Sequence, residues 1–460
     1  MSAPRTEGPD RTVPPEPRPL RPFHFPPVQR RALGNGMEVL VAEARRFPVV
    51  TLGVSLPASG LDEDAGRAGV AALTGALLDS GAGGRTGLEI AEALEGLGVL
   101  EDSGVSWDST YVGFTGLRTR IEPAARILAD LVRRPDFPEA ELDRVRAQRL
   151  AGIAQRRADP GLLANEAALR FIFDPATPYA RPLSGTLGTL EGLTRQDVKE
   201  FHATRYLPAG ATLIAAGDLS ADEAVEIGEA CFGDWVGAPG PSNPPVVRPR
   251  RDAPRVVLVD RPGSVQSELR VGQVGIARTD PDYYAVTVMN QILGGGFSSR
   301  LNLTLRERHG YTYGLSSAYA ARRHPGPFIV STAVQSGATA ASIREILREA
   351  GAIREAPVTQ AELDDARGYL AGVFPLRLET TAGIASRLSQ IAVHGLPDDD
   401  IDRYRERILA VSADDVLRAA REHLDPDAMV AVVAGDAAQL RGPLEELGEV
   451  RVVQPAELES

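Results

Sequence analysis

An arginine and a tyrosine seven positions apart, Arg306 and Tyr313, are the side chains of this sequence best placed for chemistry. They follow a run of three glycines, Gly294, Gly295 and Gly296. A guanidinium offers several planar donors to carbonyl oxygens, and a phenol in a dry cleft can donate to an oxyanion. Taken singly, the arginine would more often form a surface ion pair, the tyrosine would more often belong to a core, and a glycine would cap a helix. A functional role for the pair is therefore inferred from the segment around it and not from the two residues alone.

We expect this segment to form a helix, a turn and a strand. Three glycines exceed what a helix C-cap requires and allow another backbone to approach closely. A helix is predicted over residues 297–308, with Phe297, Leu301 and Leu305 on its buried face. Tyr311 and Tyr313 should then lie on one face of a following strand.

The string from Gly294 to Ser317, GGGFSSRLNLTLRERHGYTYGLSS, closely resembles the arginine–tyrosine signature of the pitrilysin-like (M16) zinc peptidases, in their short bacterial M16B branch. In that family Leu-Arg is followed six residues later by Gly-Tyr or a close variant. Here Leu305-Arg306 is followed by Tyr-Thr-Tyr, so the family tyrosine falls on Tyr313. The resemblance covers almost the whole chain after about the first 25 residues. It implies that Arg306 orients a substrate peptide and that Tyr313 stabilises the transition-state oxygen, in trans to a zinc ion.

The zinc motif of that family, His-x-x-Glu-His, is missing. The matching stretch reads GVAALTGALLDS, which puts Ala72 and Ala76 at the two histidine positions and Gly75 at the glutamate base. The third ligand, a distal glutamate, would fall near Val145, and no acid occurs between residues 144 and 158. A catalytic zinc needs about three protein ligands and a base for its water. We therefore expect no metal and no cofactor in this chain. The resemblance to the family implies that zinc is held by a partner subunit.

Other catalytic patterns are absent from the sequence. The six histidines never occur at i, i+4 spacing, and there is no nucleophile elbow, phosphate loop or dinucleotide fingerprint. These absences leave the arginine–tyrosine segment as the candidate site, with the three glycines as weaker candidates for substrate contact.

An internal repeat predicts the fold. Leu193–Leu219 matches Val411–Ala437 at a constant offset of 218 residues, and each segment indicates a helix, a proline break, an apolar strand and a Gly-Asp turn. Thr194 and Ser412 fall at the same offset, where each would be a helix N-cap. Neighbouring strand-like runs favour an α+β class, with two homologous halves that each pack helices on a largely antiparallel sheet. The resemblance to the M16 family implies the LuxS/M16 metallohydrolase-like fold. The predicted organisation is a disordered proline-rich arm (1–25), an N-terminal domain (26–236), a linker (237–254) and a C-terminal domain that carries the pair (255–460).

Composition bounds the function classes. A chain of 460 residues suits two domains, and a formal charge of −12 argues against non-specific nucleic-acid binding. The single cysteine, Cys231, excludes an internal disulfide. No run of about 20 apolar residues could span a membrane, and the start of the chain lacks a signal-peptide core, so we expect a cytoplasmic protein without membrane association.

Together these features predict the zinc-less subunit of a heterodimeric M16B metalloendopeptidase. It would be inactive alone and would contribute Arg306 and Tyr313 when paired with a chain that carries His-x-x-Glu-His. Two alternatives stay open: a structural core-like subunit, and a homodimeric peptide-binding module without proteolysis. The sequence does not identify the peptide, the partner or the stoichiometry.

Overall fold

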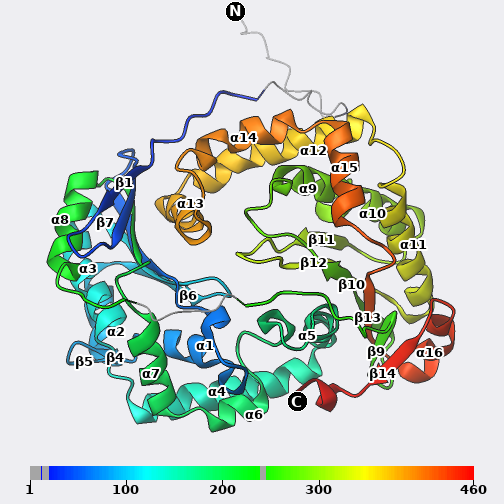
Figure 1. Ribbon diagram of the computed structural model, residues 1–460, viewed down its shortest axis with the longest axis horizontal. Coiled ribbons are helices and arrows are strands. Elements are labelled where there is room, and N and C mark those ends of the chain that lie inside the picture. The colour runs from blue at the N-terminus through cyan, green and yellow to red at the C-terminus, as the bar shows by residue number, and fades with distance from the viewer. Residues whose placement is uncertain (1–11, 13–19, 239–244, 460) are drawn as a thin grey trace, which may run out of the picture.

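The chain forms two halves, each built on a six-stranded sheet, in the computed structural model, which describes residues 12, 20–238 and 245–459 (Figure 1). Four of the five pairings in the first sheet and three of the five in the second are antiparallel. The predicted α+β class with two homologous, largely antiparallel halves is confirmed.

The strands of the first sheet are β1 (Gln29–Ala32), β2 (Glu38–Glu43), β3 (Val49–Leu56), β6 (Leu100–Val105), β7 (Thr110–Leu117) and β8 (Thr212–Gly217). Those of the second are β9 (Val256–Asp260), β10 (Gln266–Val274), β11 (Leu315–Tyr319), β12 (Pro327–Gln335), β13 (Val430–Gly435) and β14 (Val450–Val453). A short ribbon joins β4 (Gly81–Ala82) and β5 (Arg85–Thr86).

The helices of the first half are α1 (Val70–Gly75), α2 (Gly87–Leu97), α3 (Arg118–Arg133), α4 (Glu139–Ala158), α5 (Pro160–Ile172), α6 (Leu187–Gly192), α7 (Arg195–Arg205) and α8 (Ala221–Phe232). Those of the second half are α9 (Tyr283–Asn290), α10 (Arg300–Asn302), α11 (Thr339–Ala352), α12 (Gln360–Val373), α13 (Thr381–His394), α14 (Asp400–Ala410), α15 (Ala413–His423) and α16 (Ala437–Glu445).

The two sheets repeat one topology. Their strand orders are β1-β2-β8-β3-β7-β6 and β14-β9-β13-β10-β12-β11, so five strands correspond and β6 and β11 are equivalent edges. The repeat seen in the sequence starts α7 and α15, where Thr194 accepts from the N–H of Asp197 and Ser412 accepts from that of Asp415. Both predicted N-caps are thus confirmed. The apolar runs after these helices form β8 and β13, which are buried at every position.

Each half lends one helix to the sheet of the other. Helix α5 of the first half packs on β10 and β13 of the second sheet, and α13 of the second half packs on β3 and β8 of the first. The exchange gives two apolar clusters between the halves, one around Phe171 and Val432 and one around Ile214 and Leu388. A central sheet strand with both faces covered can be apolar throughout, which explains the composition of β8 and β13.

The arm predicted over 1–25 falls mostly outside the described residues, and so do 239–244 of the predicted linker (237–254). The described end of the arm contacts the second half, where the N–H of Phe25 donates to the Asp402 carboxylate at 3.1 Å. No helix in the described part of the chain is both long and apolar enough to cross a bilayer.

Candidate functional site

The three glycines form the end of a helix that widens before it stops. Helix α9 continues into a π-helical turn over Gln291–Gly295. A Cβ on Gly294 would lie 2.5 Å from the Oγ of Ser317 on β11, and one on Gly296 would lie 2.5 Å from the Nε2 of Gln291. A side chain at Gly294 would therefore collide with Ser317, whereas at Gly296 the flexible end of Gln291 could move aside.

The predicted helix over residues 297–308 starts later than expected. Helix α10 begins at Arg300 and continues as a second π-helical turn, Leu303–Arg308. Leu301 and Leu305 are fully buried, as predicted, but Phe297 is 75% exposed, so its assignment to the buried face is wrong. The phenylalanine precedes the helix and therefore does not share its apolar face.

The Arg306 guanidinium lies over the ring of this exposed phenylalanine. Its guanidinium carbon is 4.2 Å from the centre of the Phe297 ring, a distance typical of a cation–π contact. Its Nε is 3.6 Å from the Glu307 carboxylate, and about a third of the side chain is exposed. The guanidinium is thus held in place by a ring while part of it still faces solvent.

Tyr313 points into solvent and is 97% exposed. It precedes β11, which begins only at Leu315, so the expectation that Tyr311 and Tyr313 share a strand face is wrong. Asn302 fixes the strand start: its Nδ2 donates to the Leu315 carbonyl at 2.9 Å, and its Oδ1 accepts from the Leu315 N–H at 3.1 Å. Tyr311 packs instead on His309, with ring centres 4.8 Å apart. Tyr313 is therefore presented on an anchored loop beside the edge strand.

Three of the positions that the sequence analysis assigns to the missing zinc motif line a small cavity in the first half. Ala72, Gly75 and Ala76, on and just after α1, border a space of about 490 Å³ together with the end of β6. Val145 on α4 is buried in the core of this half and does not line the cavity. A Cβ on Gly75 would collide with Val105 of β6. These residues offer no donor atom for a metal and no space for a glutamate base, so they do not fit zinc.

An arginine that the sequence interpretation missed borders the same cavity. Arg149, one helical turn after Val145 on α4, donates from Nη2 to the carbonyl of Ala72 at 2.8 Å. Burial, and then the nearby Arg156, lower the pKa of this guanidinium, which still stays protonated at neutral pH. The arginine-rich, acid-free run between residues 144 and 158 was the available sign of a cation here.

A buried acid, Glu63, caps the N-terminal end of α1. The Glu63 carboxylate accepts from the N–H groups of Gly69 at 3.0 Å and of Ala71 at 2.7 Å, which belong to the start of the helix. Burial raises the pKa of Glu63 to about 7, and these two hydrogen bonds oppose the rise. The carboxylate thus caps a helix and is not a free base.

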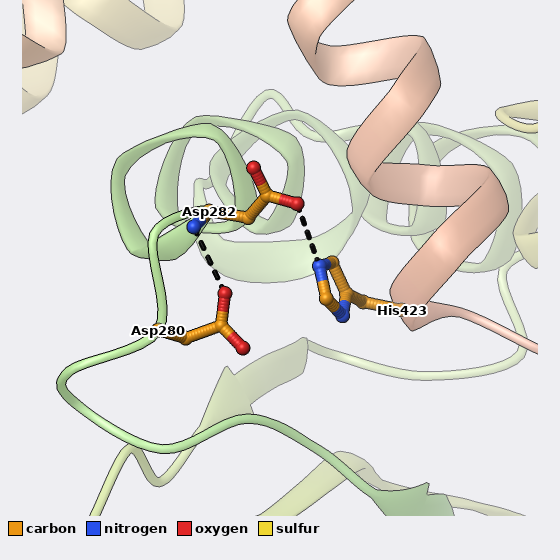
Figure 2. A group of neighbouring side chains, drawn as sticks. All are labelled: Asp280, Asp282 and His423. Atoms are coloured by element: carbon orange, nitrogen blue, oxygen red, sulfur yellow. Dashed lines mark hydrogen bonds and ion pairs between the residues drawn. The ribbon is translucent and has the colours of Figure 1, made fainter.

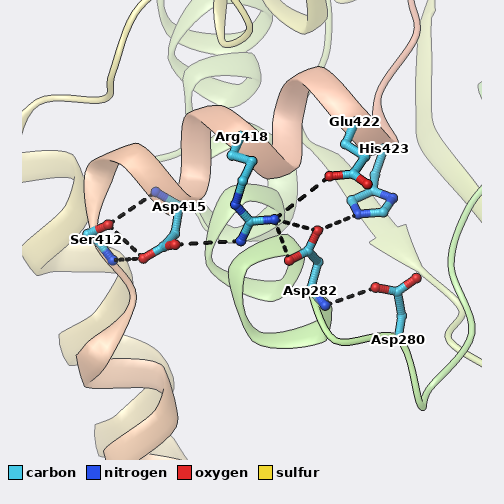
Figure 3. Close-up of polar contacts among 7 residues, drawn as sticks. All are labelled: Asp280, Asp282, Ser412, Asp415, Arg418, Glu422 and His423. Carbon is cyan, nitrogen blue, oxygen red and sulfur yellow. Dashed lines mark hydrogen bonds and ion pairs between the residues drawn. The ribbon is translucent and has the colours of Figure 1, made fainter.

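One cluster of metal-binding residue types occurs in the described part of the chain, at the junction of α9 and α15 (Figure 2). The Nε2 of His423 is 2.8 Å from Asp282, whose own N–H donates to Asp280 at 2.9 Å. Figure 3 shows Arg418 beside the same group, with Nη1 at 2.6 and 2.7 Å from the two oxygens of Asp282. Although burial would raise the pKa of Asp282, the hydrogen bonds from Arg418 and His423 hold it below its usual range. A guanidinium already neutralises this carboxylate, so the cluster joins two helices.

Comparison with protein families gives a match over residues 192–370 to a family described as "Peptidase M16 inactive domain". The crystal structure of a peptidase M16 inactive domain from Pseudomonas fluorescens is similar at a TM-score of 0.83 and 30% identity, covering 89% of this chain and 98% of that one. A structure described as a protease from Helicobacter pylori shares the fold at a TM-score of 0.83 and 18% identity, covering 90% of this chain and all of that one.

Two relatives known by sequence carry different names. An "Uncharacterized zinc protease" of Streptomyces coelicolor is 27% identical and covers 86% of this chain and 87% of its own length. A "Non-peptidase homolog YmxG" of Helicobacter pylori is 24% identical and covers 76% of this chain and 80% of its own length. Both proteases and non-peptidases are therefore named among proteins similar to this chain.

Proposed function

Because this chain belongs to the M16 peptidase family and is a member of its inactive type, we propose that it is the zinc-less subunit of a two-chain zinc endopeptidase. In this proposal a partner subunit with a His-x-x-Glu-His motif supplies the zinc and the general base. This chain supplies Arg306 and Tyr313 across the interface, to a peptide bound between the two subunits. We place the complex in the cytoplasm. Disulfides are rare in that compartment, and the single cysteine of this chain is free and buried.

The observation that carries the proposal is the exposure of Tyr313. A tyrosine kept for packing would bury its ring, yet this one is 97% exposed on a loop whose two ends are anchored. Phe297 and Leu303, from the same segment, are 75% and 50% exposed. Large apolar side chains that face solvent together mark a surface that another molecule covers.

The two side chains suit different parts of the reaction. The Arg306 guanidinium, steadied by Phe297, can donate to carbonyl oxygens of an extended peptide and so orient it. The Tyr313 hydroxyl can donate to the oxygen of the carbonyl under attack, where negative charge develops. Neither role requires a metal in this chain, which agrees with the loss of donors at Ala72, Gly75 and Ala76.

The test is reconstitution. The purified chain is assayed for cleavage of a quenched fluorescent peptide library, alone and after mixing with an M16 chain from the same genome that carries His-x-x-Glu-His. We expect no cleavage by either chain alone and chelator-sensitive cleavage by the mixture. Chelator-sensitive cleavage by this chain alone would overturn the proposal, and so would an unchanged activity of the zinc chain on mixing.

A structural subunit without a part in proteolysis is the second candidate, favoured by the Helicobacter pylori relative named as a non-peptidase. The two functions differ in whether a peptide touches the segment 297–313. A peptide with a photoreactive group, bound to the reconstituted pair, should crosslink to this segment if the chain takes part in peptide binding. A purely structural subunit would give crosslinks to the partner alone.

A further inference from the structure

Arg149 of the first half is a partly buried cation that forms no ion pair with a carboxylate among the described residues. Within the described ranges its guanidinium makes one hydrogen bond, to the uncharged carbonyl of Ala72 at 2.8 Å. Its Nε is enclosed and has no hydrogen-bond partner. Buried charges in proteins are normally paired, because the loss of hydration is otherwise uncompensated. An unpaired guanidinium on the wall of a cavity is therefore suited to receive an anion.

Both arginines and acids surround this cavity. Arg156 donates to the Oγ of Ser184, which itself lines the cavity, at 3.4 Å. The acid that acts most on Arg149 is Glu63, but it makes no ion pair with it and is held by the two backbone N–H groups at the start of α1. Arg181 approaches the same acid and donates to its backbone carbonyl at 3.1 Å. Two acids lie nearby as well: Glu101 of β6 accepts from the cavity-lining Ser103 at 2.8 Å, and Glu166 faces Arg156. Arg149 is the charged side chain that lines the cavity itself.

The cavity opens beside a free sheet edge. Among the described residues, strand β6 is the outermost strand of the first sheet and pairs only with β7. Ser103, Gly104 and Val105, the last three residues of β6, line the cavity, and α1 packs directly against β6. An edge strand presents unpaired N–H and C=O groups that can accept one more strand. Alternate side chains of such an added strand would project on the α1 side of the sheet, toward Arg149.

We propose that this cavity binds the side-chain carboxylate of an aspartate or glutamate in an extended peptide that adds to β6, with Arg149 as the cation that receives it. The positions assigned to the missing zinc motif would then serve as a pocket for an acidic residue, with a guanidinium in place of the metal's charge. A side-chain carboxylate fits both directions of the added strand, whereas a terminal carboxylate fits one. The inference rests on the proposed function only for the class of ligand, a peptide.

The test measures binding to the isolated chain, without any partner. Three nine-residue peptides carry an N-terminal fluorophore and the same apolar, β-prone sequence: one with a central glutamate and an amidated end, one with a central glutamine and an amidated end, and one with that glutamine and a free C-terminal carboxylate. Fluorescence anisotropy gives their Kd values. Since a charge-assisted hydrogen bond replaces a neutral one, we expect the glutamate peptide to bind about tenfold or more tightly than the glutamine amide.

Variants locate this preference. Arg149→Gln should abolish it and Arg149→Lys should retain part of it, whereas Arg144→Gln, which removes the same charge from an exposed site on α4, should preserve it. Hydrogen exchange on the native chain gives a second measurement that needs no variant: the glutamate peptide should protect residues 100–105, and the glutamine amide at the same concentration should not. Thermal denaturation confirms that each variant is folded.

Three results would overturn the proposal. Equal affinities of the two amidated peptides for the native chain would remove the carboxylate pocket. A preference that survives Arg149→Gln in a folded variant would place the pocket elsewhere. Tighter binding of the peptide with the free terminus than of the glutamate peptide would assign the site to a terminal carboxylate. None of these results depends on zinc, so a failed reconstitution of peptidase activity and a failed carboxylate preference are separate outcomes.

Discussion

The equivalent edges of the two sheets, β6 and β11, have opposite surroundings on the same scaffold. Beside β6, small residues stand on and just after α1 at Ala72, Gly75 and Ala76, and the cavity next to them is bounded by a partly buried arginine, Arg149. Beside β11, the corresponding region presents an exposed aromatic and a partly exposed arginine. Strand order and register set where an edge lies. The side chains next to it decide whether a charged group there is shielded from solvent or presented at the surface. In this protein the two halves are alike in fold and differ in chemistry.

The strongest test of this contrast is Tyr313→Phe in the reconstituted pair. Loss of one donor to a developing oxyanion typically lowers kcat by a factor on the order of 10²–10³, and we expect that loss here with little change in KM. Steady-state kinetics on a single quenched peptide measures it.

Tyr311→Phe is the matched control, because this ring lies two positions away and is packed on His309. It should leave kcat within about twofold, since a packed ring offers no donor to the peptide. If Tyr313→Phe is as active as this control, the exposed phenol has no part in the reaction. The proposed catalytic difference between the β11 edge and the β6 edge would then be wrong.

The pH dependence of the free energy of unfolding should reflect the burial of Glu63, which caps α1 beside the first edge. The folded state keeps a proton on Glu63 up to about pH 7, whereas the unfolded chain releases it near 4.5. The unfolded state therefore binds fewer protons in this window, and the free energy of unfolding should fall as the pH rises from about 4.5 to 7. At about 1.4 kcal/mol per pKa unit, the loss is at most on the order of 3 kcal/mol.

Urea denaturation at several pH values measures this loss, and Glu63→Gln should make the curve flatter because the variant has no group to titrate. Glu166→Gln is the comparison: burial also raises the pKa of that carboxyl, so this variant should flatten the curve as well, but without removing the cap of α1. An unchanged slope in Glu63→Gln would show that this carboxyl is already ionised in the folded protein.

Sequence patterns predicted more of the second edge than of the first. The repeat and its N-caps, Thr194 and Ser412, followed from local hydrogen bonding, and Leu301 and Leu305 followed from helical periodicity. Phe297 was misplaced because periodicity alone does not tell where a helix begins, and the two π-helical turns have no simple sequence signal. Arg149 was missed because its role depends on the carbonyl of Ala72, 77 positions away. Contacts between distant segments are what a single sequence does not contain.

Rebuilding the zinc motif tests whether the first edge has closed over its old site. In the triple variant Ala72→His, Gly75→Glu, Ala76→His, the new side chain at residue 75 must displace Val105, and both histidines enter the cavity bounded by Arg149. Overpacking of this kind typically costs about 1–3 kcal/mol, so we expect a lower Tm and no stoichiometric zinc binding.

Adding Arg149→Glu to this triple variant supplies an acid near the expected third ligand and removes the opposing charge. If zinc then binds, measured by calorimetry, the guanidinium was the main obstacle. Tight zinc binding by the triple variant itself would contradict the conclusion that the cavity no longer fits a metal.

The smallest effect is expected from metal alone, and it separates the cavity from the acidic cluster of the second half. A ligand that binds only the folded state raises stability by RT ln(1 + [L]/Kd), so tight zinc binding would raise Tm by several degrees. We expect a shift below about 1 °C on adding zinc or a chelator, because Ala72 and Ala76 offer no donors and Arg418 already neutralises Asp282. If zinc raised Tm and His423→Gln removed the rise, the metal would lie at the α9–α15 junction. The two halves would then differ in metal binding as well, with the second half and not the first as the one that holds an ion.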